Sequence, residues 1–118
     1  MEPLAPSILA RWFTEDFRSR DPVAVHRIEQ QVLATAAEGY AACCGALREA
    51  DLRAAVPRIT IPTLVLAGSH DPAVPIDDVR WLAGHIPGAR FVELPTAHLS
   101  NVEAPGAFNE TISSFLAE

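Results

Sequence analysis

The chain has 118 residues, which is enough for one domain and too few for two of ordinary size. Hydrophobic residues make up 49% of it and charged residues 20%, and this balance excludes an intrinsically disordered chain. The basic residues are nine arginines set against fifteen acidic residues, and the resulting net charge of −6 argues against a nucleic-acid partner.

The sequence also argues against membrane insertion and secretion. No apolar run approaches the roughly 20 residues of a membrane-spanning helix, and residues 1–10 lack the basic start and apolar stretch of a secretory signal. The adjacent Cys43 and Cys44 would strain the peptide between them if they formed a disulfide, and they are too few for a four-ligand zinc site. We therefore expect a cytoplasmic protein without a metal, whose two cysteines are small buried hydrophobic side chains.

Up to about Pro57 the pattern predicts helices. A short one is expected over 7–13, and Asp21-Pro22 marks the start of a second, because aspartate caps helices and proline suits their first turn. Apolar residues then recur at helical spacing through residue 33. Gly39 interrupts the pattern, and a third helix is expected over 40–50.

After Pro57 the pattern predicts a strand, a helix, a second strand and a second helix. The apolar run 59–67 suits a strand buried on both faces, with Pro62 near its beginning, where a missing backbone donor matters least. A helix is expected over 76–85, a strand over 90–94, and a final helix from Pro105. Two strands joined through a helix imply a parallel, right-handed crossover, so this half belongs to the α/β class.

Two polar residues follow the two strands. Asp71 comes after the first strand and His98 after the second, and parallel strands bring such loops to one edge of the sheet. An aspartate bonded to a histidine fixes the imidazole tautomer and stabilises its protonated form. Taken alone, Asp71 could merely cap a turn with Pro72, and His98 could be an ordinary loop histidine. His26, His70 and His85 are expected to face solvent.

The segments ITIPTLVLAGSHDPAVP and GARFVELPTAHLSNVEAPGAFNETISSFL resemble the last two strands and terminal helix of α/β-hydrolases. The segments RWFTEDF, EGYAACCGALREADLR and PRITIPTLV resemble 3-oxoadipate enol-lactonases. The resemblance implies an incomplete α/β-hydrolase fold, in which a helical cap remnant (1–56) precedes a core part (57–118) with parallel strands. It also implies that Asp71 orients His98 as general base, that Trp12 and Tyr40 lie over the substrate pocket, and that no cofactor is needed. Generic packing is the alternative role for the two aromatic side chains.

None of the serines lies in the G-x-S-x-G pattern that carries the nucleophile of this family. We therefore expect a C-terminal fragment whose intact parent acts on a small lactone or ester. The alternatives are another esterase, a haloperoxidase-like or C–C-bond hydrolase, or a non-catalytic interaction domain. A two-stranded sheet leaves an unpaired edge, so we expect self-association or pairing with a missing N-terminal half. Without that half to pack the loop tips, Asp71 and His98 should lie near each other without a tight bond.

Overall fold

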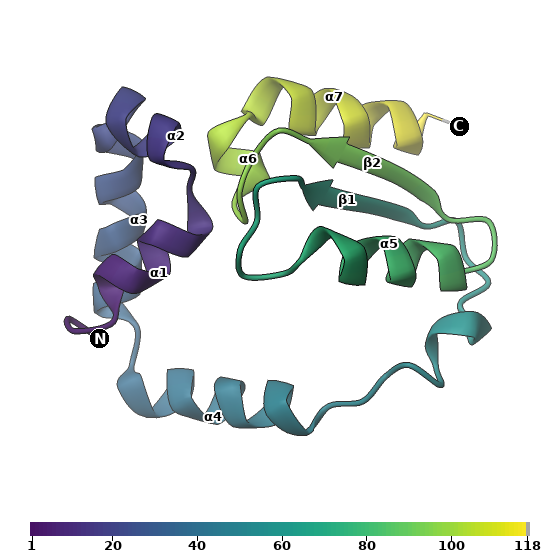
Figure 1. Cartoon of the computed structure of the whole chain (residues 1–118), viewed down its shortest axis with the longest axis horizontal. Helices are drawn as coiled ribbons and strands as arrows, with labels where there is room; N and C mark the ends of the chain where they lie inside the picture. The colour runs from purple at the N-terminus through teal and green to yellow at the C-terminus, as the bar shows by residue number, and fades with distance from the viewer. Residues whose placement is uncertain (118) are drawn as a thin grey trace.

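The computed structural model describes residues 1–117, so only Glu118, at the end of the predicted core part, lies outside it. The chain folds as a run of helices followed by an α/β unit (Figure 1). In chain order they are α1 (Ala5–Trp12), α2 (Glu15–Arg20), α3 (Pro22–Ala34), α4 (Ala37–Glu49), a 3-10 turn η1 (Val56–Arg58), β1 (Leu64–Gly68), α5 (Ile76–His85), β2 (Arg90–Leu94), α6 (Ser100–Glu103) and α7 (Pro105–Leu116).

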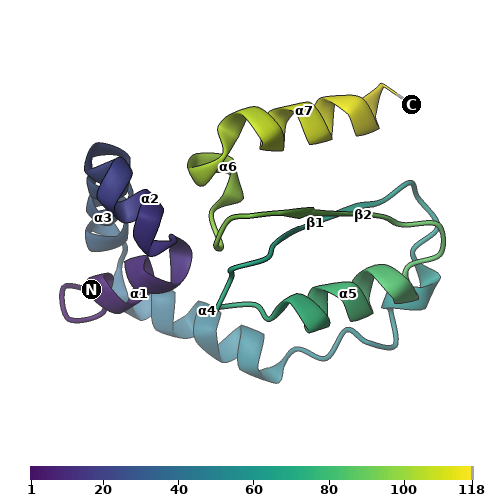
Figure 2. The ribbon, with the colours of Figure 1, turned by 45° about the horizontal axis from the view of Figure 1, so that its top comes forward.

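The two strands form a parallel sheet in which Leu64 pairs with Arg90 and Gly68 with Leu94. Helix α5 lies on one side of this sheet and α7 on the other (Figure 2). The predicted parallel crossover is confirmed, and α5 and β2 have the predicted bounds. The first strand begins later than expected, at Leu64. Its partner begins only at Arg90, after a turn in which Gly88 has a φ of +71°, so residues 59–62 have no strand to pair with.

Helix starts follow from local chemistry. The Asp21 side chain accepts the Ala24 backbone N–H at 3.0 Å, so this residue caps α3 as predicted. The prediction that Gly39 interrupts the helical pattern is wrong, because Gly39 lies inside α4. The break falls earlier, at Thr35 and Ala36, whose backbones are extended. A single glycine costs a helix only about 1 kcal/mol, which is too little to end it.

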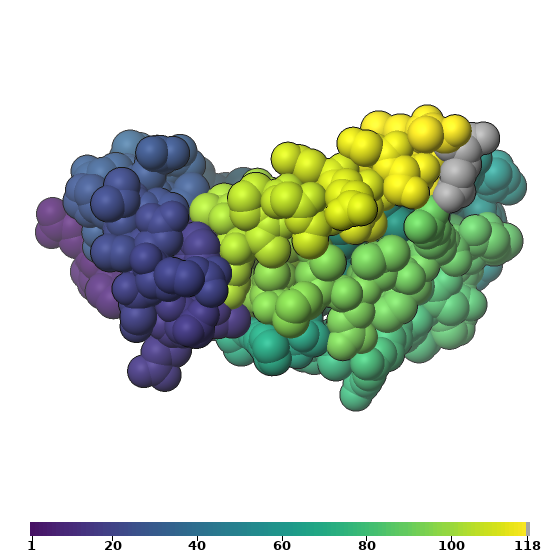
Figure 3. Space-filling view, turned by 90° about the horizontal axis from the view of Figure 1, so that it is seen from above, coloured from purple at the N-terminus to yellow at the C-terminus, as the bar shows by residue number. Residues whose placement is uncertain are grey.

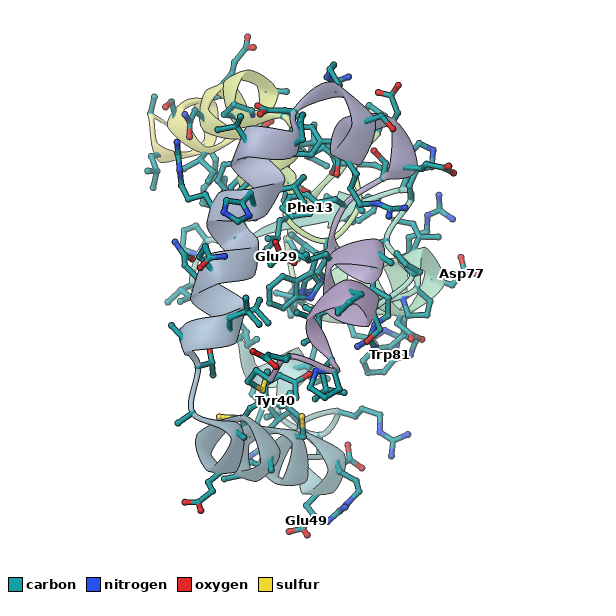
Figure 4. The ribbon with its side chains drawn as sticks, turned by 90° about the vertical axis from the view of Figure 1, so that its left-hand side faces the viewer. Phe13, Glu29, Tyr40, Glu49, Asp77 and Trp81 are labelled. Atoms are coloured by element: carbon teal, nitrogen blue, oxygen red, sulfur yellow. The ribbon has the colours of Figure 1, made fainter. Side chains whose placement is uncertain are left out.

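Helices α1 to α3 share two small apolar clusters. Ala5, Ile8 and Val32 form one of them, and Leu9, Phe13 and Phe17 form the other. Figure 4 shows Phe13 between α3 and the α1–α2 pair. Leu99 and Val102, which follow β2, pack against the second cluster. In the space-filling view the α1–α3 helices therefore abut the α6 end of the second half (Figure 3).

Helix α4 has no buried residue. The prediction that Cys43 and Cys44 are buried is wrong: both are free thiols on the exposed surface of this helix. A helix is present at these positions as expected, but no other element of the described chain covers the face that carries the two cysteines. Within residues 1–117, no helix is both long enough and apolar enough to cross a membrane.

Candidate active site

The loops after β1 and β2 start side by side because the two strands end in register. Beyond the strands, the Ser69 N–H donates to the Leu94 carbonyl at 2.8 Å, and the His70 N–H donates to the Thr96 carbonyl at 3.0 Å. Gly68 permits this close approach, since a Cβ there would come within 2.2 Å of the Ala97 carbonyl oxygen. The two loops are thus held together by their backbones.

Asp71 and His98 form a direct hydrogen bond. The Asp71 Oδ2 lies 2.8 Å from the His98 Nδ1, and the Asp71 side chain is only 9% exposed. The other carboxylate oxygen, Oδ1, accepts the backbone N–H groups of Ala73 at 2.7 Å and Val74 at 3.1 Å. These two bonds orient the carboxylate toward His98. The expectation of proximity is confirmed, while the expectation of a loose pair is wrong, because the acid loop itself holds the carboxylate.

The His98 side chain is 36% exposed and lies against helix α1. The Trp12 ring stacks on the imidazole, with ring centroids 6.1 Å apart and planes 24° apart. The Leu99 N–H donates to the Trp12 carbonyl at 3.1 Å. Trp12 is therefore a direct neighbour of the pair. Tyr40, in the first turn of α4, instead packs against the cluster of Ala5, Ile8 and Val32 (Figure 4).

Glu103 joins the histidine loop to the helical half, and the sequence pattern assigned it no role. The residue is 8% exposed. It accepts the Ala97 N–H at 3.0 Å and the Thr14 hydroxyl. The residue belongs to the Asn101-x-Glu103-x-Pro105 run, which lies within the longer segment that resembles α/β-hydrolases. A carboxylate three residues into a short helix is not by itself a signal of burial.

The remaining titratable groups do not extend this pair. His26, His70 and His85 are exposed, as predicted. A hydrogen bond from Arg53 lowers the pKa of Asp51 to about 2, but Asp51 lies in the segment after α4 and not in either loop. A pocket of about 400 Å³ opens beside His70, Thr14 and Glu103, and neither Asp71 nor His98 lines it. Residues 1–117 contain no group of side chains suited to hold a metal ion.

No model of a known protein family matches the chain. The 3-oxoadipate enol-lactonase 2 of Acinetobacter baylyi is 40% identical over 116 residues, which cover 98% of this chain and 43% of that relative. The crystal structure of the enol-lactonase from Burkholderia xenovorans matches with a TM-score of 0.98 at 45% identity, over 100% of this chain and 45% of that one. A thermophilic esterase from Thermogutta terrifontis matches with a TM-score of 0.89 at 29% identity, over 97% of this chain and 43% of that one. The chain has the fold of the C-terminal part of an α/β-hydrolase. It spans less than half the length of the relatives it matches.

In this α/β-hydrolase part, the His98 ring is hydrogen-bonded to the Asp71 carboxylate. The buried Thr96 and Ser100 hydroxyls lie 2.7 Å apart and bond to each other. Ser69 precedes the acid loop and lies outside any G-x-S-x-G pattern. The arrangement can accept and hold a proton at the imidazole.

Proposed function

We propose that the chain is the acid- and histidine-bearing part of a serine-type α/β-hydrolase that opens 3-oxoadipate enol-lactone in the β-ketoadipate pathway of aromatic breakdown. The observation that carries the proposal is the 2.8 Å bond between Asp71 and His98 at the carboxyl ends of two parallel strands. The names of the relatives that align with almost the whole chain support the choice of substrate. An esterase has the same fold, so the alternative is that the intact enzyme acts on a broader range of esters.

In the proposed reaction, a serine outside these 118 residues attacks the lactone carbonyl, and the Nε2 of His98 takes the hydroxyl proton. The C–O bond of the ring breaks, His98 gives its proton to the departing enol oxygen, and the acyl group stays on the serine. The neutral His98 then takes a proton from water, whose oxygen attacks the acyl-enzyme, and passes that proton to the serine oxygen as the free acid is released. Asp71 accepts the Nδ1–H bond throughout, so it selects the tautomer in which Nε2 is free to act as a base. This chemistry requires no metal and no organic cofactor.

The helical residues 1–56 act in this proposal as the cap over the substrate. Trp12 contacts the His98 ring, so it is placed to contact a substrate held next to the imidazole. Tyr40 packs against the same cluster of Ala5, Ile8 and Val32 as Trp12.

The test supplies the missing part. The chain is fused to the N-terminal part of the Acinetobacter baylyi enol-lactonase that it does not cover, and turnover of the enol-lactone and of a simple aryl ester is compared. We expect selective lactone hydrolysis by the fusion and no enzymatic rate from the 118-residue chain alone. Equal handling of both esters would reject lactone specificity.

Variants of the fusion test the roles of the pair. His98→Ala should remove nearly all turnover, and Asp71→Asn should lower kcat by about 10⁴, the loss expected when the imidazole adopts the wrong tautomer. His70→Ala is the matched control, because His70 is exposed and adjacent to Asp71, and it should retain its rate. Hydrolysis that survives His98→Ala would reject the proposed mechanism.

A second candidate function is a non-catalytic, self-associating domain. It is favoured by several large apolar side chains that are at least 70% exposed, namely Leu47, Leu52, Ile61 and Leu116. Strand β1 also pairs with only one neighbour in the described residues. Exposed apolar surface and unpaired strand edges promote association. Sedimentation of the chain at rising concentration should show dimers or larger species, or complex formation when the N-terminal part is added. A chain that stays monomeric and does not bind the N-terminal part would reject both self-association and complex formation.

A further inference from the structure

The buried carboxylate of Glu103 lies at the end of α6, between the histidine loop and the helical half. Its Oε2 accepts the Ala97 N–H at 3.0 Å and the Thr14 N–H at 3.4 Å, while Oε1 accepts the Thr14 hydroxyl. All three partners are donors. An ionised carboxylate can accept all of them, whereas a glutamine amide has one accepting oxygen and would turn its NH₂ group toward a donor.

The same connection between α1 and α2 also holds the other side of His98. The Ala97 N–H, just before His98, reaches Thr14 through Glu103. The Leu99 N–H, just after it, donates to the Trp12 carbonyl. The backbone on each side of His98 is therefore tied to residues 12–14, and not only to the strand that carries it.

The orientation of the Thr14 hydroxyl is fixed by a bond within its own helix start. Its hydroxyl oxygen accepts the Phe17 N–H at 3.2 Å and so caps α2. The single hydroxyl proton is left to donate to Glu103. A shift of the α1–α2 connection would consequently move the Glu103 carboxylate, and with it the loop that carries His98.

We propose that Glu103 is a positioning residue that locks the histidine loop to the α1–α2 connection and so keeps the His98 imidazole facing Asp71. The functional consequence rests on the proposed role of His98 as general base: displacement of the helical cap would be transmitted to the base. The alternative is that Glu103 only holds the two halves together and has no effect on the imidazole.

The test reads the imidazole directly in the 118-residue chain. Nitrogen-15 chemical shifts of the neutral His98 ring report which nitrogen carries the proton. In the wild type it should be Nδ1, because the Asp71 carboxylate can only accept. In Glu103→Gln we expect a mixture of both tautomers and about tenfold faster hydrogen exchange at the Ala97 and Leu99 amides, as when an ordinary hydrogen bond is lost.

Glu93→Gln is the matched control, because it removes a carboxylate from β2 that pairs with Arg80 and has no bond to the histidine loop. It should leave the His98 tautomer unchanged. A folded Glu103→Gln chain that keeps a single Nδ1–H tautomer and wild-type amide exchange would overturn the proposal.

A second pair of variants covers the case in which Glu103→Gln does not fold. Thr14→Val removes the hydroxyl and keeps the shape, while Thr14→Ser keeps the hydroxyl. The proposal predicts mixed tautomers in the valine variant and the wild-type tautomer in the serine variant. A purely structural role would lower the melting temperature of Thr14→Val and leave the His98 tautomer unchanged. These NMR measurements use no substrate, so they are independent of the activity of the fusion. If the variants change the His98 tautomer as predicted but the fusion hydrolyses no ester, the proposed function is rejected and the positioning role of Glu103 is retained.

Discussion

Replacing Gly68 with alanine should displace the histidine loop. Gly68 is the last residue of β1, and its φ is not positive, so any residue could adopt its backbone conformation. What requires glycine at position 68 is space. A Cβ placed there lies 2.2 Å from the Ala97 carbonyl oxygen and 2.5 Å from that of Thr96. Both obstacles are backbone atoms, so no side chain can rotate out of the way.

The size of the effect follows from these distances. Ordinary contact begins at 3.4 Å, so the Ala97 carbonyl must retreat by about 1.2 Å. Overpacking of this kind typically costs about 1–3 kcal/mol, which for a domain of this size lowers the melting temperature by about 4–12 °C. The next residue is His98, whose 2.8 Å bond to Asp71 would be lost after a shift of that length. In the active fusion, a misplacement of about 1 Å lowers the rate on the order of 10²-fold.

The assay is thermal unfolding followed by circular dichroism, with the His98 ring nitrogens read by NMR. Gly84→Ala is the matched control, because Gly84 lies in α5 and a methyl group added there would meet nothing within 4 Å. It should raise stability by about 0.5–1 kcal/mol, since alanine favours a helix. If Gly68→Ala melts like Gly84→Ala and keeps the Asp71–His98 bond, the steric reasoning is refuted.

Three further predictions concern other parts of the chain. Phe13 is 1% exposed and packs among helices α1 to α3. The substitution Phe13→Ala should lower the free energy of unfolding by about 3–5 kcal/mol, as measured by urea unfolding. A carbon-13 titration should find the pKa of Asp51 near 2, and Arg53→Gln should return that pKa toward 3.8. The stability that the Asp51–Arg53 bond contributes is present above pH 3.8 and is lost as the pH falls through about 2. Cys43 and Cys44 should both react with a thiol reagent in the native chain, and reaction of fewer than two thiols would contradict their exposure.

Local signals were enough to predict most of the second half. The α5 bounds followed from an apolar stripe closed by Pro87-Gly88, and the β2 bounds from the short run 90–94 closed by Pro95. The Asp21 cap of α3 was likewise readable, because it depends on a residue and its near neighbours. Helix α2 was missed, although Thr14 before Glu15 and Asp16 is a cap followed by acidic first-turn residues.

Features that depend on distant partners were predicted less well. The late start of β1 reflects where β2 begins, and the exposure of Cys43 and Cys44 reflects the absence of a covering element in the described chain. An apolar pattern shows that a face is suited to burial, but it does not show whether another element covers that face.

The sequence by itself determined the α/β class, the parallel crossover and the two loops that carry Asp71 and His98, because these depend on periodicity and on residues next to each other in the chain. Only the tertiary structure decided that the pair bonds tightly and that Glu103 joins the histidine loop to Thr14. These bonds link positions 27 and 89 residues apart. A hydrogen bond depends on distance and direction in space, and these are set only once the loops, strands and helices have packed.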